Sequence, residues 1–72
     1  MTIKDKIKRY REMYIQKYGR EPTSIILGYE VMSEIKRDMP ERYVAPGALL
    51  YGMTVIMDNN KPTRVEAGDF ET

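Results

Sequence analysis

A chain of 72 residues with neither cysteine nor histidine must fold through a hydrophobic core alone. Small chains often add disulfides or a structural zinc ion to a modest core, but a disulfide framework and the usual zinc sites are excluded here. A thiol nucleophile and histidine acid–base catalysis are excluded as well. We therefore expect a single domain over residues 1–72, with one modest core and no cofactor.

The charges are divided unevenly along the chain, although the formal net charge is only +1. Residues 1–20 hold seven basic and two acidic side chains, whereas residues 21–72 hold five basic and nine acidic ones. The total gives no chain-wide case for nucleic acid or a membrane surface, so any such case is regional. No apolar run approaches the roughly 20 residues of a membrane span. No apolar stretch of a secretory signal follows the first lysines. We expect a cytoplasmic protein that binds no membrane.

The first segment has the pattern of an amphipathic helix. Thr2, followed three residues later by Asp5, resembles a capping box, and a long stretch without glycine or proline comes next. Gly19 is typical of a left-handed C-terminal cap. The apolar residues recur at intervals of three and four, which places them on one stripe of the helix. These residues are Ile3, Ile7, Tyr10, Tyr14 and Tyr18.

A buried strand and a second helix are predicted next. The β-branched run from Ser24 to Leu27 is typical of a buried strand. After Gly28, apolar residues repeat at helical spacing, and Pro40 ends this helix because it disfavours helical geometry at the residue before it. The repeating residues are Val31, Met32, Ile35 and Met39.

The last third predicts an irregular connection followed by a hairpin. Residues 40–47 contain two prolines and a glycine, and we expect Tyr43 and Val44 to pack back onto the body of the protein. Residues 53–57 and 63–67 are strand candidates, residues 58–61 have turn chemistry, and Pro62 suits a sheet edge. The element order is therefore α-β-α-β-β. We expect an α+β fold in which two helices pack on a small sheet that contains a C-terminal hairpin.

The basic face of the first helix is one candidate binding surface. Lys4, Lys8 and Arg11 follow each other at helical spacing, and Arg9 and Lys6 are expected to extend the same charged side. Such a face can meet phosphates, and interleaved tyrosines can stack on unpaired bases. It can also meet an acidic protein or remain solvated, and the sequence leaves these alternatives open.

The three tyrosines of that helix are a second candidate. Tyr10, Tyr14 and Tyr18 exceed what a small core must contain, and each hydroxyl needs a polar partner. Aromatic residues are enriched at protein contacts, so this stripe can pair with a second copy about a twofold axis. The alternative is ordinary packing against the sheet of the same chain.

The carboxylates near the C-terminus and the serines give little support for catalysis. No calcium-loop spacing is present, so we expect turn and surface roles for Asp58, Glu66, Asp69 and Glu71 rather than a metal or acid–base site. The glycines match neither phosphate-binding pattern. Ser24 and Ser33 have no histidine partner. We expect no catalytic residues and no enzymatic activity.

Residues 22–70 contain short motifs that resemble a known domain. Pro22-Thr23-Ser24-Ile25-Ile26-Leu27, the helix containing Tyr29, the segment from Leu50 to Asp58, and Ala67-Gly68-Asp69-Phe70 are similar to the peripheral domain of tailed-phage major capsid proteins. The basic first helix takes the place of the long spine helix of that fold. A capsid subunit is much longer and has an axial domain with no counterpart here, so the resemblance implies a small phage or prophage protein without catalytic residues.

Together these patterns predict a phage-derived or prophage-derived accessory protein that acts by protein–protein interaction. We expect it to form a homodimer or another homo-oligomer through Tyr10, Tyr14 and Tyr18, with a host or phage protein as a further partner. The alternative is a nucleic-acid-binding regulator that uses Lys4, Lys8, Arg9 and Arg11.

Overall fold

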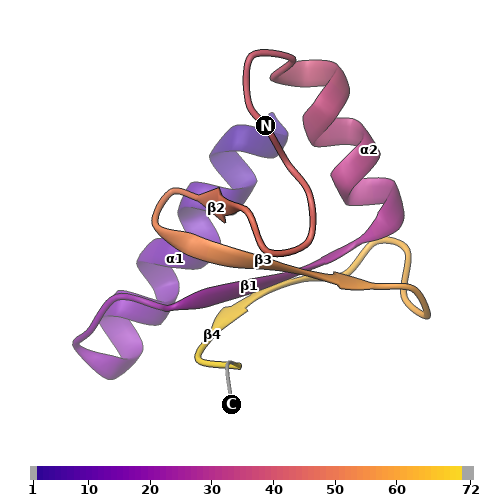
Figure 1. Ribbon diagram of the computed structural model, residues 1–72. Helices are drawn as coiled ribbons and strands as arrows, with labels where there is room; N and C mark the ends of the chain where they lie inside the picture. The colour runs from indigo at the N-terminus through magenta and orange to yellow at the C-terminus, as the bar shows by residue number, and fades with distance from the viewer. Residues whose placement is uncertain (1, 71–72) are drawn as a thin grey trace.

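A computed structural model describes residues 2–70 as two helices packed on a four-stranded mixed sheet (Figure 1). The elements follow in the order α1 (Ile3–Tyr18), β1 (Ser24–Gly28), α2 (Tyr29–Asp38), β2 (Leu49–Leu50), β3 (Met53–Asp58) and β4 (Val65–Gly68). The strand order across the sheet is β2-β3-β1-β4, and both helices lie over the same face. The predicted α+β class is confirmed.

The pairing of the last two long strands differs from the expectation. β1 pairs in parallel with β3 and antiparallel with β4, so that Ile25 lies opposite both Val55 and Ala67. The predicted C-terminal hairpin is therefore wrong, because β1 lies between its two strands. All five residues of β1 are buried, which is typical of a central strand that has a neighbouring strand on each side.

The hairpin that does form joins β2 to β3. Its turn residues Tyr51 and Gly52 have positive φ values of 51° and 81°, as a two-residue turn between antiparallel strands requires. The sequence pattern did not predict β2, which is only two residues long.

The predicted ends of α1 are confirmed. Thr2 Oγ1 accepts a hydrogen bond from the Asp5 N–H at 3.2 Å, and Gly19 adopts a left-handed conformation with φ of 71°. Helix α2 ends before Pro40, also as predicted.

The N-terminus of α2 is capped by the backbone of a distant loop. The Pro62 carbonyl accepts hydrogen bonds from the N–H groups of Glu30 and Val31, at 3.0 and 3.3 Å. This loop runs so close to Gly28 that a Cβ there would lie 2.2 Å from the carbonyl oxygens of Lys61 and Pro62. Glycine at this position therefore makes the carbonyl cap possible.

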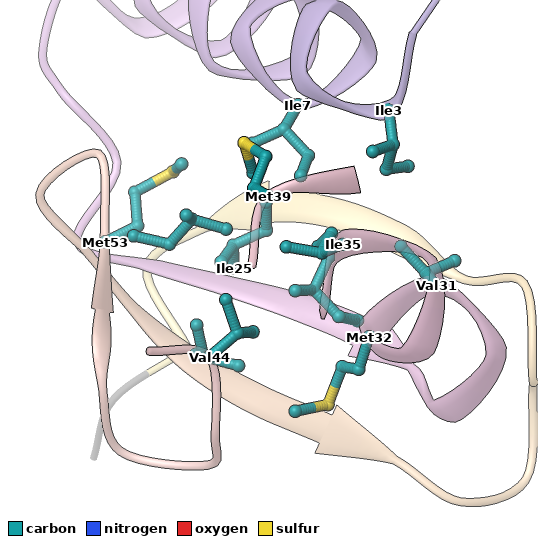
Figure 2. Close-up of a cluster of buried hydrophobic side chains, with 12 residues drawn as sticks. Ile3, Ile7, Ile25, Val31, Met32, Ile35, Met39, Val44 and Met53 are labelled. Carbon is teal, nitrogen blue, oxygen red and sulfur yellow. The ribbon is translucent and has the colours of Figure 1, made fainter. Parts of the chain in front are cut away.

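The core fills the space between the helices and the sheet. Figure 2 shows the side chains of Ile3 and Ile7 pointing from α1 into the core, toward Ile35 and Met39. Val44 joins the core as predicted, whereas Tyr43 is 79% exposed and its predicted packing is wrong. Adjacent side chains of a non-helical segment point to opposite sides, so only one of this pair reaches the core.

The end of the described chain is tied to the start of β1. Ser24 Oγ donates to the Gly68 carbonyl at 3.1 Å, and Thr23 Oγ1 donates to Asp69 Oδ1 at 2.8 Å. The Phe70 ring lies over Gly68, where a Cβ would be only 2.7 Å from the ring. The start of β1 and the residues at the end of β4 are therefore held together.

Candidate functional site

The tyrosine stripe lies on a single helix and runs from the core to the surface. Ile3 and Ile7 are buried, Tyr10 and Tyr14 are half-buried, and Tyr18 is 54% exposed. The ring centroids of Tyr14 and Tyr18 are 4.6 Å apart, with the planes tilted by 42°. The C-terminal half of the stripe therefore offers aromatic surface to solvent.

This half of α1 forms a groove with strand β4. The groove has a volume of about 260 Å³, and we name it the tyrosine groove. Its lining residues are Tyr10, Met13, Tyr14, Lys17 and Tyr18 from α1, and Val65, Glu66 and Ala67 from β4. Helical spacing predicts the three tyrosines, whereas Met13 and the β4 wall were not predicted. Met13 lies three residues after Tyr10, and this spacing is the signal that could have found it.

Basic side chains border the tyrosine groove on the helix side. Lys6 and Arg9 line an adjoining hollow with Tyr10 and Met13. The Nζ of Lys17 lies 5.3 Å from the centroid of the Tyr18 ring. Along this border the groove favours a partner that carries negative charge.

A second hollow adjoins the other end of the groove, beside Arg20 and the residues that follow β4. Tyr14, Tyr18 and Arg20 form a hollow there with residues 66–70. The pKa of Arg20 is raised above its usual value, chiefly by the nearby Tyr14 hydroxyl and to a smaller extent by Asp69, whose Oδ2 lies 4.0 Å from Arg20 Nη2. Arg20 therefore adds a positive charge at this end of the stripe.

The basic residues of α1 do not share one side, which corrects the expected surface of Lys4, Lys8, Arg9 and Arg11. Lys8 and Arg11 face Tyr51, and the Lys8 Nζ lies 5.4 Å from the centroid of its ring. Arg9 lies on the side of Tyr10 and Met13. The reason is helical geometry, because successive residues are rotated by about 100° around the axis. Lys4 is exposed one turn before Lys8.

Internal contacts engage much of the charge around Tyr51. The Arg11 guanidinium pairs with Glu21 at 2.6 Å, and the guanidinium carbon of Arg42 lies 4.7 Å from the centroid of the Tyr51 ring. The Tyr51 hydroxyl lies 3.7 Å from the Met39 sulfur. These contacts hold the β2–β3 turn against the helices and leave less free positive charge for a phosphate.

The carboxylates near the C-terminus have structural partners. Asp58 and Glu66 both bind Arg64: the Asp58 Oδ2 is 2.9 Å from Arg64 Nη1, and the Glu66 Oε2 is 3.0 Å from Arg64 Nε. The hydrogen bond from Arg64, helped by the Asn60 N–H, holds the pKa of Asp58 below its usual value. Asp69 accepts from Thr23, whereas Glu71 lies outside the described residues. Between residues 2 and 70, no cluster of three or more acidic side chains is arranged to hold a metal ion.

The two serines also act within the fold. Ser24 is fully buried and bonds to the residues after β4, and Ser33 Oγ donates to the Tyr29 carbonyl at 3.1 Å. Every buried side-chain nitrogen or oxygen in the described part of the chain has a hydrogen-bond partner. The tyrosine groove, in contrast, keeps apolar side chains at the surface, since Met13 and Tyr18 are each 54% exposed.

Comparisons with family models, curated proteins and solved structures give no match. Neither described helix is long and apolar enough to cross a bilayer.

Proposed function

We propose that this chain is a non-enzymatic protein-interaction module that self-associates through the tyrosine groove. The supporting observation is an apolar groove whose rim residues Met13 and Tyr18 are each 54% exposed. Tyrosine and methionine are enriched in protein interfaces, and covering their apolar surface releases free energy. Self-association gives each copy a cover for this surface.

The size of the chain supports the same proposal. Its core lies between two helices and one small sheet. A chain of about this length buries only about 60% of the surface that its unfolded form exposes. Association is a common way to add buried apolar area to such a small fold. The resemblance of residues 22–70 to a phage capsid domain favours a phage or prophage accessory factor as the biological setting.

Nucleic-acid binding has weaker geometric support. Arg11 is paired with Glu21, Lys8 lies over Tyr51, and Arg9 lies on a different side of α1. A phosphate-binding surface needs several free cations on one face. If nucleic acid were the partner, its affinity would fall steeply with added salt.

Sedimentation equilibrium over a range of concentrations tests the proposal. We expect the unaltered chain to have twice the monomer mass, and the double variant Met13→Glu with Tyr18→Glu to be monomeric, because buried carboxylates would oppose association. The matched control is Tyr43→Glu with Leu49→Glu, which replaces residues that are 79% and 67% exposed and lie outside the groove. The control should remain dimeric. Circular dichroism checks that each variant is folded, and a monomeric unaltered chain at every concentration would refute the proposal.

A further inference from the structure

Strand β4 forms one edge of the sheet, and its outer side has no neighbouring strand among residues 2–70 (Figure 1). On its inner side, the Gly28 N–H donates to the Arg64 carbonyl at 2.8 Å, at the end of the antiparallel ladder with β1. Backbone groups alternate in direction along such a ladder. The N–H and carbonyl of Glu66 therefore point toward β1, and those of Val65 and Ala67 point outward.

The outward backbone groups lie beside the tyrosine groove. The side chains of Val65 and Ala67 pack toward the core under α1, whereas Glu66 lines the groove at the sheet edge and its side chain alternates to the opposite face, where Arg64 binds it. A strand added to β4 would therefore form backbone hydrogen bonds at the edge and bring its own alternate side chains beneath Tyr10, Met13 and Tyr14. Such an edge commonly accepts a further strand.

We propose that the strand added here is β4 of a second copy, paired antiparallel about a twofold axis. The two four-stranded sheets would then form one continuous sheet, with both α1 helices on the same face and their tyrosine grooves meeting across the axis. This inference rests on the proposed self-association and specifies how it occurs.

The apolar and charged residues of β4 are complementary to the tyrosine groove and the basic half of α1, beside which the β4 strand of a second copy would lie. Its alternate residues Val65 and Ala67 are apolar, and its C-terminal end carries Asp69. Tyr18 lies at the C-terminal end of β4, so the other half of α1, with Lys6 and Arg9, extends toward the start of the strand. Antiparallel pairing brings Asp69 of the second copy to that basic end, so the charges are complementary.

A twofold axis at Glu66 satisfies the backbone of both copies. Val65 of each copy would lie opposite Ala67 of the other, and the outward N–H and carbonyl groups of these residues would form reciprocal hydrogen bonds. The two Glu66 side chains would face each other. Each Glu66 carboxylate is already bound to Arg64 of its own copy. In the paired strands it would also lie diagonally opposite the Arg64 of the other copy. The two guanidinium groups would therefore offset the repulsion between the two carboxylates.

Disulfide cross-linking tests this register directly, because the chain has no cysteine of its own. In Glu66→Cys the two thiols would face each other across the axis, on Cα atoms about 4.5 Å apart, which is within the range of a disulfide. Thr63→Cys is the matched control. Its residue is exposed and three positions from the axis, so the two thiols would be about 20 Å apart. We expect complete loss of monomer on mild oxidation of Glu66→Cys, and none for Thr63→Cys at the same concentration.

Amide hydrogen exchange provides a second test on the unaltered chain. We expect the N–H groups of Val65 and Ala67 to exchange slowly at high concentration and quickly on dilution, and the Glu66 N–H to be protected at both. A dimer in which Glu66→Cys does not cross-link and both outward amides exchange quickly would overturn the strand pairing but leave the proposed self-association intact. A chain that sediments as a monomer at every concentration would refute both.

Discussion

The Oγ of Ser24 accepts a hydrogen bond from the backbone N–H of Phe70 at 2.8 Å. The same oxygen donates to the Gly68 carbonyl at 3.1 Å. One fully buried hydroxyl at the start of β1 therefore fixes the C-terminal end of β4 and the residues that follow it. The groove is lined by the neighbouring residues Val65, Glu66 and Ala67, so this buried hydroxyl also helps to fix the β4 wall of the groove.

Replacing this hydroxyl is expected to destabilise the fold. In Ser24→Ala the part-buried N–H of Phe70 loses its acceptor, which costs about 0.5–1.5 kcal/mol of unfolding free energy. The measurement is urea unfolding followed by circular dichroism. Ser33→Ala is the control, because it removes an exposed hydroxyl bound only to the preceding turn of its own helix. Equal stabilities of the two variants would show that the Ser24 bonds contribute little.

Gly28→Ala is expected to destabilise the protein through a steric clash. The added Cβ would lie 2.2 Å from the carbonyl oxygens of Lys61 and Pro62, so the loop must move and weaken the cap of α2. Overpacking of this kind costs about 1–3 kcal/mol, and thermal unfolding would measure it. An unchanged melting temperature would contradict the close approach of the loop.

Gly52→Ala is expected to be unfavourable for a different reason. Gly52 has φ of 81° with open space around it, so the cost is conformational, about 1–2 kcal/mol. Asparagine tolerates this backbone conformation better, so Gly52→Asn should lose less stability than Gly52→Ala. Denaturant midpoints of the two variants make the comparison, and the reverse order would argue against a left-handed turn.

The Asp58–Arg64 pair predicts a loss of stability in acid. The pKa of Asp58 lies below its ordinary value of 3.8 in the folded chain, so folding favours the ionised carboxylate. The resulting stabilisation is complete above that ordinary value and is lost as the pH falls through the lowered pKa. The difference in unfolding free energy between the unaltered chain and Asp58→Asn should therefore shrink between neutral pH and about pH 2. A difference that stays constant over this interval would contradict the assignment.

Local features of the fold were predictable because single residues set them. Thr2 and Gly19 define the ends of α1 through their own hydrogen bonding and backbone conformation, and Pro40 prevents α2 from continuing. Strand pairing was not predictable in this way. The turn after Asp58 is compatible with a hairpin, but β1, whose five residues are all buried, takes the central position and separates β3 from β4.

The part of the candidate site that is set by local sequence was predictable, and the part that depends on strand pairing was not. Helical spacing placed Tyr10, Tyr14 and Tyr18 on one stripe, and the structure retains this stripe. The other wall of the groove comes from β4, whose position depends on pairing with a strand 40 or so residues earlier in the chain. The expected position of Arg9 was wrong because it was grouped with the other basic residues by its charge alone. The side of a helix on which a residue lies depends on the rotation of about 100° between successive residues.

The cap that Pro62 provides to α2 has an evolutionary consequence. A main-chain carbonyl survives replacement of the side chain that carries it, so the loop between β3 and β4 can accumulate amino-acid changes while the helix keeps its terminal acceptor. An insertion or deletion would displace that oxygen. Divergent descendants of this sequence should therefore vary at residues 59–63, while the length of the loop and the side chain of Arg64, which binds Asp58 and Glu66, stay constant.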